Sequence, residues 1–247
     1  MTDPQHAPKT PPTGGNDPPS VGATIGVFAK HWTPGETKTR LAASIGAEKA
    51  ADVSKGFVET LLSRLATVSA DDHLLAFAPA ARHEAFAALP GVAEGPWRCE
   101  PQVEGSLGER MEAFFRGAGG AAVLVGSDSP DLPLDAVRDA LAWLANPRER
   151  GLVLGPTSDG GYWLIGTRGE LPPIFADMPW SDASLLAATK QRLSEAGWQE
   201  GADYQLIDPW YDVDEASDLA RLRRGLNEGD GALRALASRL DDLLGTA

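Results

Sequence analysis

Cationic side chains gather directly after the first apolar run of the chain. Lys30, Lys38 and Arg40 surround a turn made by Pro34 and Gly35. A loop that leads from a strand into a helix also presents free backbone N–H groups, which favour an anion. The loop has neither the Gly-Lys-Ser/Thr ending of a Walker A motif nor a Gly-x-Gly-x-x-Gly string. We therefore interpret it either as another type of phosphate-binding loop or as a solvated basic loop.

The overall charge makes this basic loop an exception. The 247 residues include 22 Lys plus Arg and 35 Asp plus Glu, which give a formal net charge of −13 at pH 7. This balance argues against a nucleic-acid polymer or an anionic membrane surface as the main partner, because binding either one requires a clustered positive field. An anionic small molecule needs local cations to neutralise it, and the basic loop offers them.

Two carboxylates follow other predicted strands. Asp128 comes after residues 121–126 (AAVLVG), the most apolar strand, and Asp214 follows the last strand. A carboxylate at the tip of a buried strand is costly unless it is paired or bound to a cation. Together the two could hold Mg²⁺ or Mn²⁺ and leave positions for phosphate oxygens and water. The alternatives are that Asp128 accepts N–H groups of its own turn and that Asp214 caps the following helix.

A glycine-rich and aromatic string at residues 155–166 has the composition of a sugar site. Gly160 and Gly161 permit close approach of the backbone, Tyr162 offers a flat face with a polar edge, and Asp159 can accept from hydroxyl groups. A tight hairpin turn before an aromatic strand explains the same residues. Further along, Trp180 and Ser181 add an aromatic ring beside a small hydroxyl, with packing as the alternative role of the tryptophan.

Several other classes of protein are disfavoured. One cysteine excludes an internal disulfide and any multi-cysteine metal site. No apolar run approaches the ~20 residues of a membrane-spanning helix, and no secretory signal is visible, so we expect a soluble, cytoplasmic protein. The string around Asp128 is not a Gly-x-Ser-x-Gly elbow, and all four histidines precede it, which argues against a serine hydrolase.

The elements that must position these residues alternate between strand and helix. The periodicity predicts strands at residues 23–29, 73–77, 97–101, 121–126, 151–155, 162–167 and 204–207. It predicts helices at residues 41–68, 80–89, 107–116, 134–145, 184–196, 215–226 and 232–244. This alternation indicates an α/β protein with a mostly parallel sheet covered by helices on both faces, whose ligands bind at the carboxyl ends of the strands. The proline-rich residues 1–20 predict a disordered tail, and residues 21–247 a single domain.

Taken in order, the motifs resemble those of one known group. They are Lys30 with PGETKTRL (34–41), then GSLGERM (105–111), GSDSP (126–130), GPTSDGGY (155–162) and DVD (212–214). The chain resembles small bacterial GT-A-type glycosyltransferase-like proteins, often labelled arsenosugar-biosynthesis or radical-SAM-associated transferases. That group is similar to the molybdenum-cofactor and phospholactate nucleotidyltransferases. The resemblance covers residues 25–219.

The resemblance implies a nucleotide-diphospho-sugar transferase fold and assigns roles to the motif residues. Asp128 would hold a divalent metal, with Asp214 as a second ligand of the metal or of water. Lys30, Lys38 and Arg40, with Pro34 and Gly35 of the same motif, would contact nucleotide phosphates, and Arg110 would lie near the nucleotide or sugar. Residues 159–162 would form the sugar or acceptor pocket. The chain departs from the group at Ser106, where an Asp is usual, which weakens any catalytic role of that loop.

These observations predict a metal-dependent transferase that moves a sugar from a nucleotide diphosphate sugar to a small acceptor, with Mg²⁺ or Mn²⁺ as cofactor. Asp128 and Asp159 are the candidate catalytic residues, Asp159 as a base for an acceptor hydroxyl. One alternative is a nucleotidyltransferase that joins a nucleoside triphosphate to a phosphorylated small molecule and releases pyrophosphate. The other is a non-catalytic nucleotide-binding module.

Overall fold

Seven apolar segments form one sheet. The computed structural model describes residues 22–146, 149–158, 160–180 and 182–245. The strands are β1 (Ala23–Lys30), β2 (Asp72–Ala78), β3 (Trp97–Pro101), β4 (Ala121–Gly126), β5 (Arg150–Pro156), β6 (Tyr162–Gly169) and β7 (Tyr204–Leu206). Each coincides with a strand predicted from the sequence to within two residues at either end, because a strand buried on both faces is marked by a nearly continuous apolar run.

The helices follow the predicted order, but the helices expected at residues 41–68 and 80–89 are each divided, and residues 90–93 form a helix that was not predicted. They are α1 (Thr39–Ile45), α2 (Ala47–Leu65), the 3₁₀ turn η1 (Ala80–Arg82), α3 (His83–Ala87), α4 (Pro90–Ala93), α5 (Leu107–Ala118), α6 (Leu134–Ala145), α7 (Leu185–Glu195), α8 (Ala216–Leu226) and α9 (Gly231–Leu244). The single helix expected over residues 41–68 is wrong. Gly46, with φ 90° and ψ 152°, interrupts it, a conformation that costs glycine little.

The order of the strands creates a crevice between β1 and β4. The sheet has the order β3-β2-β1-β4-β6-β5-β7, and β6 runs antiparallel to β4 and β5 while the other neighbours are parallel. From β1 the chain moves outward to β2 and β3, and then returns across β1 to form β4 on its other side. Such a reversal leaves room for a ligand at the carboxyl ends of the two strands.

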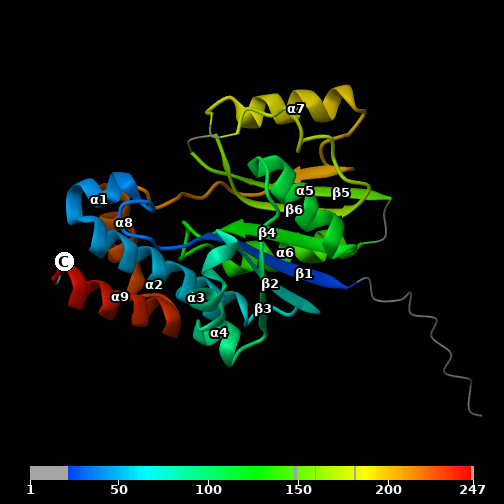
Figure 1. Cartoon of the computed structure of the whole chain (residues 1–247). Coiled ribbons are helices and arrows are strands. Elements are labelled where there is room, and N and C mark those ends of the chain that lie inside the picture. The colour runs from blue at the N-terminus through cyan, green and yellow to red at the C-terminus, as the bar shows by residue number, and fades with distance from the viewer. Residues whose placement is uncertain (1–21, 147–148, 159, 181, 246–247) are drawn as a thin grey trace, which may run out of the picture.

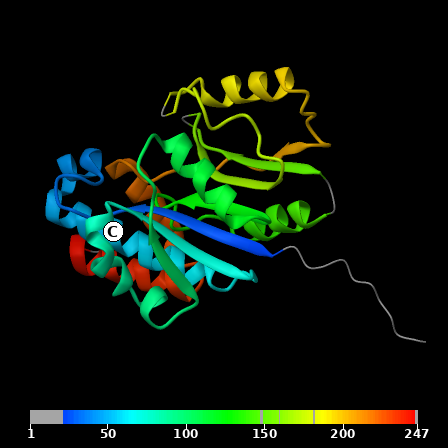
Figure 2. The same ribbon diagram turned by 45° about the vertical axis from the view of Figure 1, so that its right-hand side comes forward.

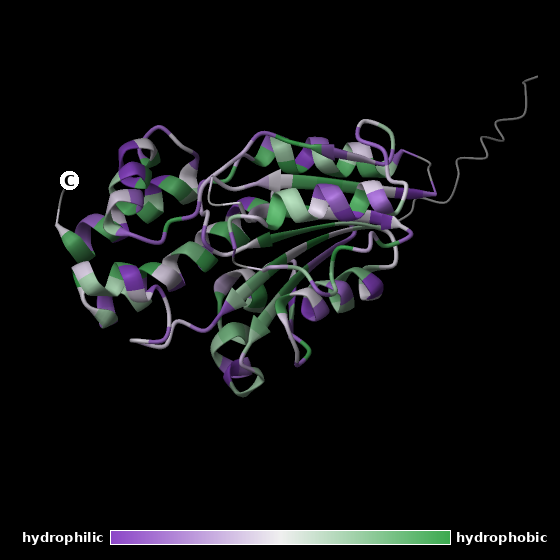
Figure 3. Ribbon diagram, turned by 90° about the horizontal axis from the view of Figure 1, so that it is seen from above, coloured by the Kyte–Doolittle hydropathy of each residue, from purple (hydrophilic) through white to green (hydrophobic). Residues whose placement is uncertain are grey.

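Helices cover both faces of the sheet, as predicted. On one face the core contains Leu61 of α2 and Val137 of α6, and on the other it contains Phe115 of α5 and Leu193 of α7. The same layers are visible in two orientations (Figure 1, Figure 2). Figure 3 shows apolar residues along the strands and polar residues on the outer faces of the helices.

A third apolar cluster joins helices from the two ends of the chain. Phe57 of α2, Leu41 of α1, Leu222 of α8 and Leu236 of α9 are all buried in it. The cluster fixes the start of α1, and with it the basic loop, against the last helices. No helix among the described residues combines the length and the apolar composition that crossing a membrane requires.

A buried arginine holds the loop that follows β4. Arg64 of α2 is only 7% exposed. Its guanidinium donates to the carbonyl oxygens of Pro130 (2.8 Å) and Leu132 (2.9 Å) and to the carboxylate of Asp230 (2.7 Å). Asp230 in turn caps α9 by accepting from the N–H of Leu233. One side chain therefore links α2, the loop after β4 and α9.

Replacement of Arg64 by alanine is expected to lower the free energy of unfolding by about 2–4 kcal/mol, because two carbonyls and one carboxylate lose their partner. Urea unfolding measures the change. The control is Arg138→Ala, since Arg138 pairs with the exposed Asp135 on the surface of α6 and such pairs contribute less than about 1 kcal/mol. Equal losses in the two variants would contradict the role given to Arg64.

Candidate active site

The crevice between β1 and β4 is a cleft of about 700 Å³. Its walls come from the segments after β1, β2 and β4, from the start of α5 and from the segment after β7. The polar and charged residues that line it are Lys30, Glu36, Thr37, Lys38, Ser54, Gln102, Arg110, Ser127, Asp128 and Asp214. Five residues that the sequence singled out for phosphate or metal binding therefore share one cleft: Lys30, Lys38, Arg110, Asp128 and Asp214.

The backbone turns at Lys38 so that its side chain points inward. Lys38 has φ 46° and ψ 45°, the left-handed conformation, which costs a non-glycine residue about 1–2 kcal/mol. Its side chain is only 4% exposed. The preceding Thr37 is buried, and its hydroxyl lies 3.3 Å from that of Ser54 in α2. This tie helps to hold a turn that an unconstrained loop would avoid.

The ammonium of Lys38 lies between two carboxylates. It forms an ion pair with Asp128 and a second with Asp214, at 3.1 Å from Oδ1. Burial by itself would lower the pKa of Lys38, but the two carboxylates outweigh it, and the pKa is raised above its ordinary value. Asp128 and Asp214 converge on one cation, as the sequence predicted for a metal, and the cation in this structure is a lysine.

Backbone contacts bring the two aspartates together from distant strands. After β7 the chain runs along the strand ends, where the N–H of Ile207 donates to Leu154 and the N–H of Val213 donates to the carbonyl of Asp128, both at 3.0 Å. The side chain of Asp214 is 46% exposed and that of Asp128 is 47% exposed. Both carboxylates therefore remain open to the cleft. Glu215, and not Asp214, is the capping residue of α8.

A third carboxylate lies beside this pair, and sequence analysis missed it. Asp212 accepts from the hydroxyl of Ser129 at 2.8 Å. Burial raises the pKa of Asp212 to about 6, and the negative charges of Asp128 and Asp214 act in the same direction. The available signal was the Asp-Val-Asp string, whose first aspartate we assigned no role.

The other two cations of the cleft are held by neutral groups. Lys30 is exposed and donates to the carbonyl of Glu36 at 2.8 Å. Arg110 donates to the carbonyl of Gly105 at 2.9 Å and to the side chain of Gln102 at 3.4 Å. Within the described part of the chain, neither cation pairs with a carboxylate, so each presents an uncompensated positive charge. Nothing in the sequence had pointed to Gln102.

Three residues of the predicted phosphate loop do not line the cleft. Pro34 and Gly35 are exposed at the outer end of the loop. The side chain of Arg40 is 73% exposed and lies 3.8 Å from Glu215. The cations of the basic loop therefore differ in place: Lys38 is buried, Lys30 faces the cleft and Arg40 lies outside it.

The described residues among those predicted for a sugar or acceptor pocket lie elsewhere in the fold. Gly160 and Gly161 form the turn between β5 and β6, closed by backbone hydrogen bonds to Thr157. Tyr162 packs into the core beside α7, where burial raises the pKa of its hydroxyl to about 12. Trp180 packs against α5. None of these four lines the cleft. The predicted Asp159 and Ser181 lie outside the described residues.

Ser106, the departure from the group's pattern, has a structural role. It caps α5: its hydroxyl accepts from the N–H of Glu109, and the Glu109 carboxylate accepts from the N–H of Ser106 at 2.7 Å. This reciprocal pair stabilises the first turn of the helix. The cap fixes the turn that carries Arg110 into the cleft.

Removal of the Lys30 ammonium is expected to weaken the binding of a nucleoside diphosphate about 10- to 100-fold, the range for a hydrogen bond between charged groups. Isothermal titration of Lys30→Ala with uridine and guanosine diphosphates measures the change. Arg40→Ala is the matched control, because it removes the same charge outside the cleft and should alter the affinity less than about twofold. Equal loss of affinity in both variants would mean that the net charge of the loop, and not the cleft, governs binding.

Comparison with known proteins agrees with this architecture. The model of the family described as "Uncharacterized protein conserved in bacteria (DUF2064)" matches residues 61–182. A crystal structure from Desulfovibrio desulfuricans G20, provisionally described as a nucleotide-diphospho-sugar transferase, is 32% identical, covers 90% of this chain and 96% of its own, and has a TM-score of 0.76. Among curated proteins no match is found.

More distant solved structures share the fold alone. A cytidylyltransferase from Leptospira borgpetersenii is 10% identical with a TM-score of 0.57, covering 90% of this chain and 94% of its own. The 4-diphosphocytidyl-2C-methyl-D-erythritol synthase from Anaerococcus prevotii is 8% identical with a TM-score of 0.52, covering 90% and 97%. The nucleotide-diphospho-sugar transferase fold expected from the sequence is thus confirmed, and the chain belongs to the family of the Desulfovibrio desulfuricans protein, with the DUF2064 match across its centre.

Proposed function

We propose that this protein is a metal-dependent transferase that moves a sugar from a nucleotide diphosphate sugar to a small acceptor. The observation that carries the proposal is the cleft at the reversal of the sheet, where Lys30, Lys38 and Arg110 face Asp128 and Asp214. In a chain with a net charge of −13, Lys30 and Arg110, which pair with no carboxylate among the described residues, give one cleft at the strand ends the local positive charge that an anionic ligand requires. The relative at 32% identity, provisionally described as a nucleotide-diphospho-sugar transferase, supports the same proposal.

The donor set suits a hard divalent cation. Asp128 and Asp214 supply carboxylate oxygens that already converge on one positive charge, and both are half exposed. No group of three or more potential metal-ligating side chains is found in the described segments. Two carboxylates fit Mg²⁺ or Mn²⁺, which protein sites commonly bind through one or two carboxylates together with substrate phosphates. When bound, such an ion would neutralise charge on the diphosphate.

The side chains of the cleft would bind and orient the donor. Lys30, free of any carboxylate partner in the described part of the chain, is placed to take one phosphate group, and Arg110 adds positive charge to the same cleft. In sugar transfer the acceptor hydroxyl oxygen bonds to the anomeric carbon and its proton is released to solvent. The bond between that carbon and the diphosphate oxygen breaks, and the nucleoside diphosphate leaves with the electron pair. Fixed cations lower the energy of that developing charge without reorganisation.

Nucleotidyl transfer is the second candidate. The same charges suit a nucleoside triphosphate, and the cytidylyltransferase from Leptospira borgpetersenii shows that this fold also occurs in such an enzyme. The two reactions differ in their products, because sugar transfer releases a nucleoside diphosphate and nucleotidyl transfer releases pyrophosphate. Product analysis therefore separates them.

The experiment follows release of nucleoside diphosphate from a panel of nucleotide diphosphate sugars, with and without Mn²⁺. The wild type is expected to release it only with the metal, and Asp128→Asn to do so at least about 100-fold more slowly, the scale of losing electrostatic stabilisation of a leaving group. Asp135→Asn, on the surface of α6 with its side chain 93% exposed, is the matched control and should retain wild-type activity.

Two results would contradict the proposal. Pyrophosphate release from a nucleoside triphosphate and a phosphorylated small molecule, without turnover of any nucleotide sugar, would establish the second candidate. Tight nucleotide binding with no turnover of either kind would identify a non-catalytic nucleotide-binding module. Thermal unfolding of Asp128→Asn checks that the variant is folded, since this change removes one of the two partners of Lys38.

A further inference from the structure

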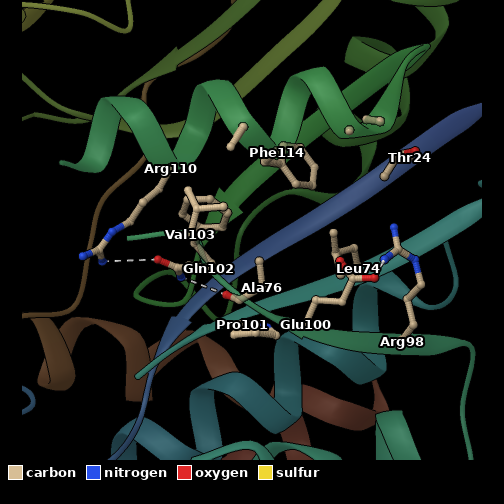
Figure 4. A pocket seen from close by; sticks show the side chains of 14 residues that line it. Thr24, Leu74, Ala76, Arg98, Glu100, Pro101, Gln102, Val103, Arg110 and Phe114 are labelled. Atoms are coloured by element: carbon tan, nitrogen blue, oxygen red, sulfur yellow. Dashed lines mark hydrogen bonds and ion pairs between the residues drawn. The ribbon is translucent and has the colours of Figure 1, made fainter. Parts of the chain in front are cut away.

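A second cavity adjoins the cleft on the face of the sheet beside α5. Its volume is about 320 Å³, within the range of small-molecule pockets. We call it the α5 pocket. The residues that line it are Thr24, Phe28, Leu74, Ala76, Arg98, Glu100, Pro101, Gln102, Val103, Arg110, Ala113, Phe114, Gly117 and Ala118. Figure 4 shows it between α5 and the strands β1, β2 and β3.

The packing on the two faces of β1 and β2 differs. On the other face, α2 and α3 pack over β1 and β2, and Phe86 of α3 is fully buried. On this face α5 lies over β1, where Gly26 lacks a Cβ that would come within 2.4 Å of the Phe114 ring. Leu74 of β2 and Phe114 of α5, 8% and 7% exposed, belong to the apolar core on this side and also line the pocket. The floor of the α5 pocket is therefore apolar.

The α5 pocket and the cleft are joined. Phe28, Gln102 and Arg110 line both. The exposed large apolar side chains of the described chain lie at this junction: Val103, 49% exposed, lines the pocket, and Leu107, 44% exposed, lines the cleft. Exposed apolar groups that gather beside a cavity indicate an apolar contact with a ligand.

The two ends of the α5 pocket carry opposite charge. At the junction, Arg110 bonds only to neutral acceptors among the residues that the structure describes. At the far end, Arg98 is occupied by Asp72, at 2.7 Å, and by Glu100. One cation and two carboxylates leave that end with a net charge of −1. An anionic group is therefore favoured at the junction and disfavoured at the far end.

We propose that the α5 pocket binds the acceptor of the transfer reaction, and that the acceptor is a small acid with an apolar body. Its carboxylate or phosphate lies against Arg110, and its apolar body lies on Phe28, Leu74 and Phe114. The anionic end of the acceptor then lies at the junction with the cleft that we propose for the donor. The role of this ligand as acceptor rests on the proposed function, whereas the binding of an apolar acid follows from the pocket itself.

The experiment measures binding of phenyl phosphate by ligand-observed NMR and isothermal titration. Inorganic phosphate has the anion without the apolar body, and benzyl alcohol has the ring without the anion. The wild type is expected to bind phenyl phosphate at least about tenfold more tightly than either, a difference of 1.4 kcal/mol or more. Similar affinity for inorganic phosphate would overturn the proposal, since the cleft alone would explain it.

Two variants locate the site. Ala113→Leu fills the α5 pocket from α5, and Val103→Asp places a carboxylate at its exposed rim, where the fold tolerates a polar side chain. Each is expected to weaken phenyl phosphate binding at least about tenfold. Ala142→Leu, at an exposed position of α6 on the other face of the sheet, is the matched control and should bind as the wild type does. Wild-type affinity in both pocket variants would overturn the proposal.

Other occupants give distinct results. Displacement of phenyl phosphate by uridine or guanosine would assign the α5 pocket to the base of the donor, and a dimer in sedimentation that Val103→Asp dissociates would assign it to a second copy of the chain. Either outcome overturns the proposal. A separate titration with nucleoside diphosphate reports on the proposed function, so that loss of the acceptor site and loss of the donor site are told apart.

Discussion

The ammonium of Lys38 joins three segments that are far apart in the chain. Lys38 follows β1, Asp128 follows β4 and Asp214 follows β7, and the ion pairs between them place all three at one point on the edge of the sheet. Two carboxylates this close would repel each other without a cation between them. Three features hold these groups in place: the left-handed backbone of Lys38, the buried contact between the hydroxyls of Thr37 and Ser54, and the segment after β7 that runs along the strand ends.

The cleft has a region of negative charge and a region of positive charge. The carboxylate pair is the place for a positive charge, which Lys38 provides in this structure and a divalent metal would provide beside a diphosphate. Lys30 and Arg110 are held by neutral carbonyl and amide groups, so their charge remains available for anions. The α5 pocket extends from Arg110 over an apolar floor. The donor site and the acceptor site that we propose therefore meet at Arg110.

The strands, and the loops that meet at their carboxyl ends, could be predicted from the sequence. The ion pairs and hydrogen bonds inside the cleft could not. An apolar run such as that of β4 predicts a strand from local sequence alone. Because ligands of such sheets bind at the carboxyl ends of the strands, Asp128 and Lys30, which follow or end two strands, are expected in the same cleft. The burial of Lys38 depends on Asp214, 176 residues away, so charge counting assigned this lysine to phosphates alone. Arg64 bonds to a backbone carbonyl of the loop after β4 and Gln102 to the carbonyl of Ala76 in β2, and no sequence pattern marks such contacts. The break at Gly46 was missed because glycine is tolerated inside many helices.

We propose that the carboxylates of Asp128 and Asp214 form the cation site of a nucleotide-dependent transferase. A crystal structure of the protein with Mn²⁺ and a nucleoside diphosphate is the decisive experiment, because manganese is located by its anomalous scattering. We expect an anomalous peak bonded to both carboxylates and to the diphosphate, inside the cleft between β1 and β4. Manganese and diphosphate bound elsewhere, with both ion pairs of Lys38 intact, would contradict the proposal.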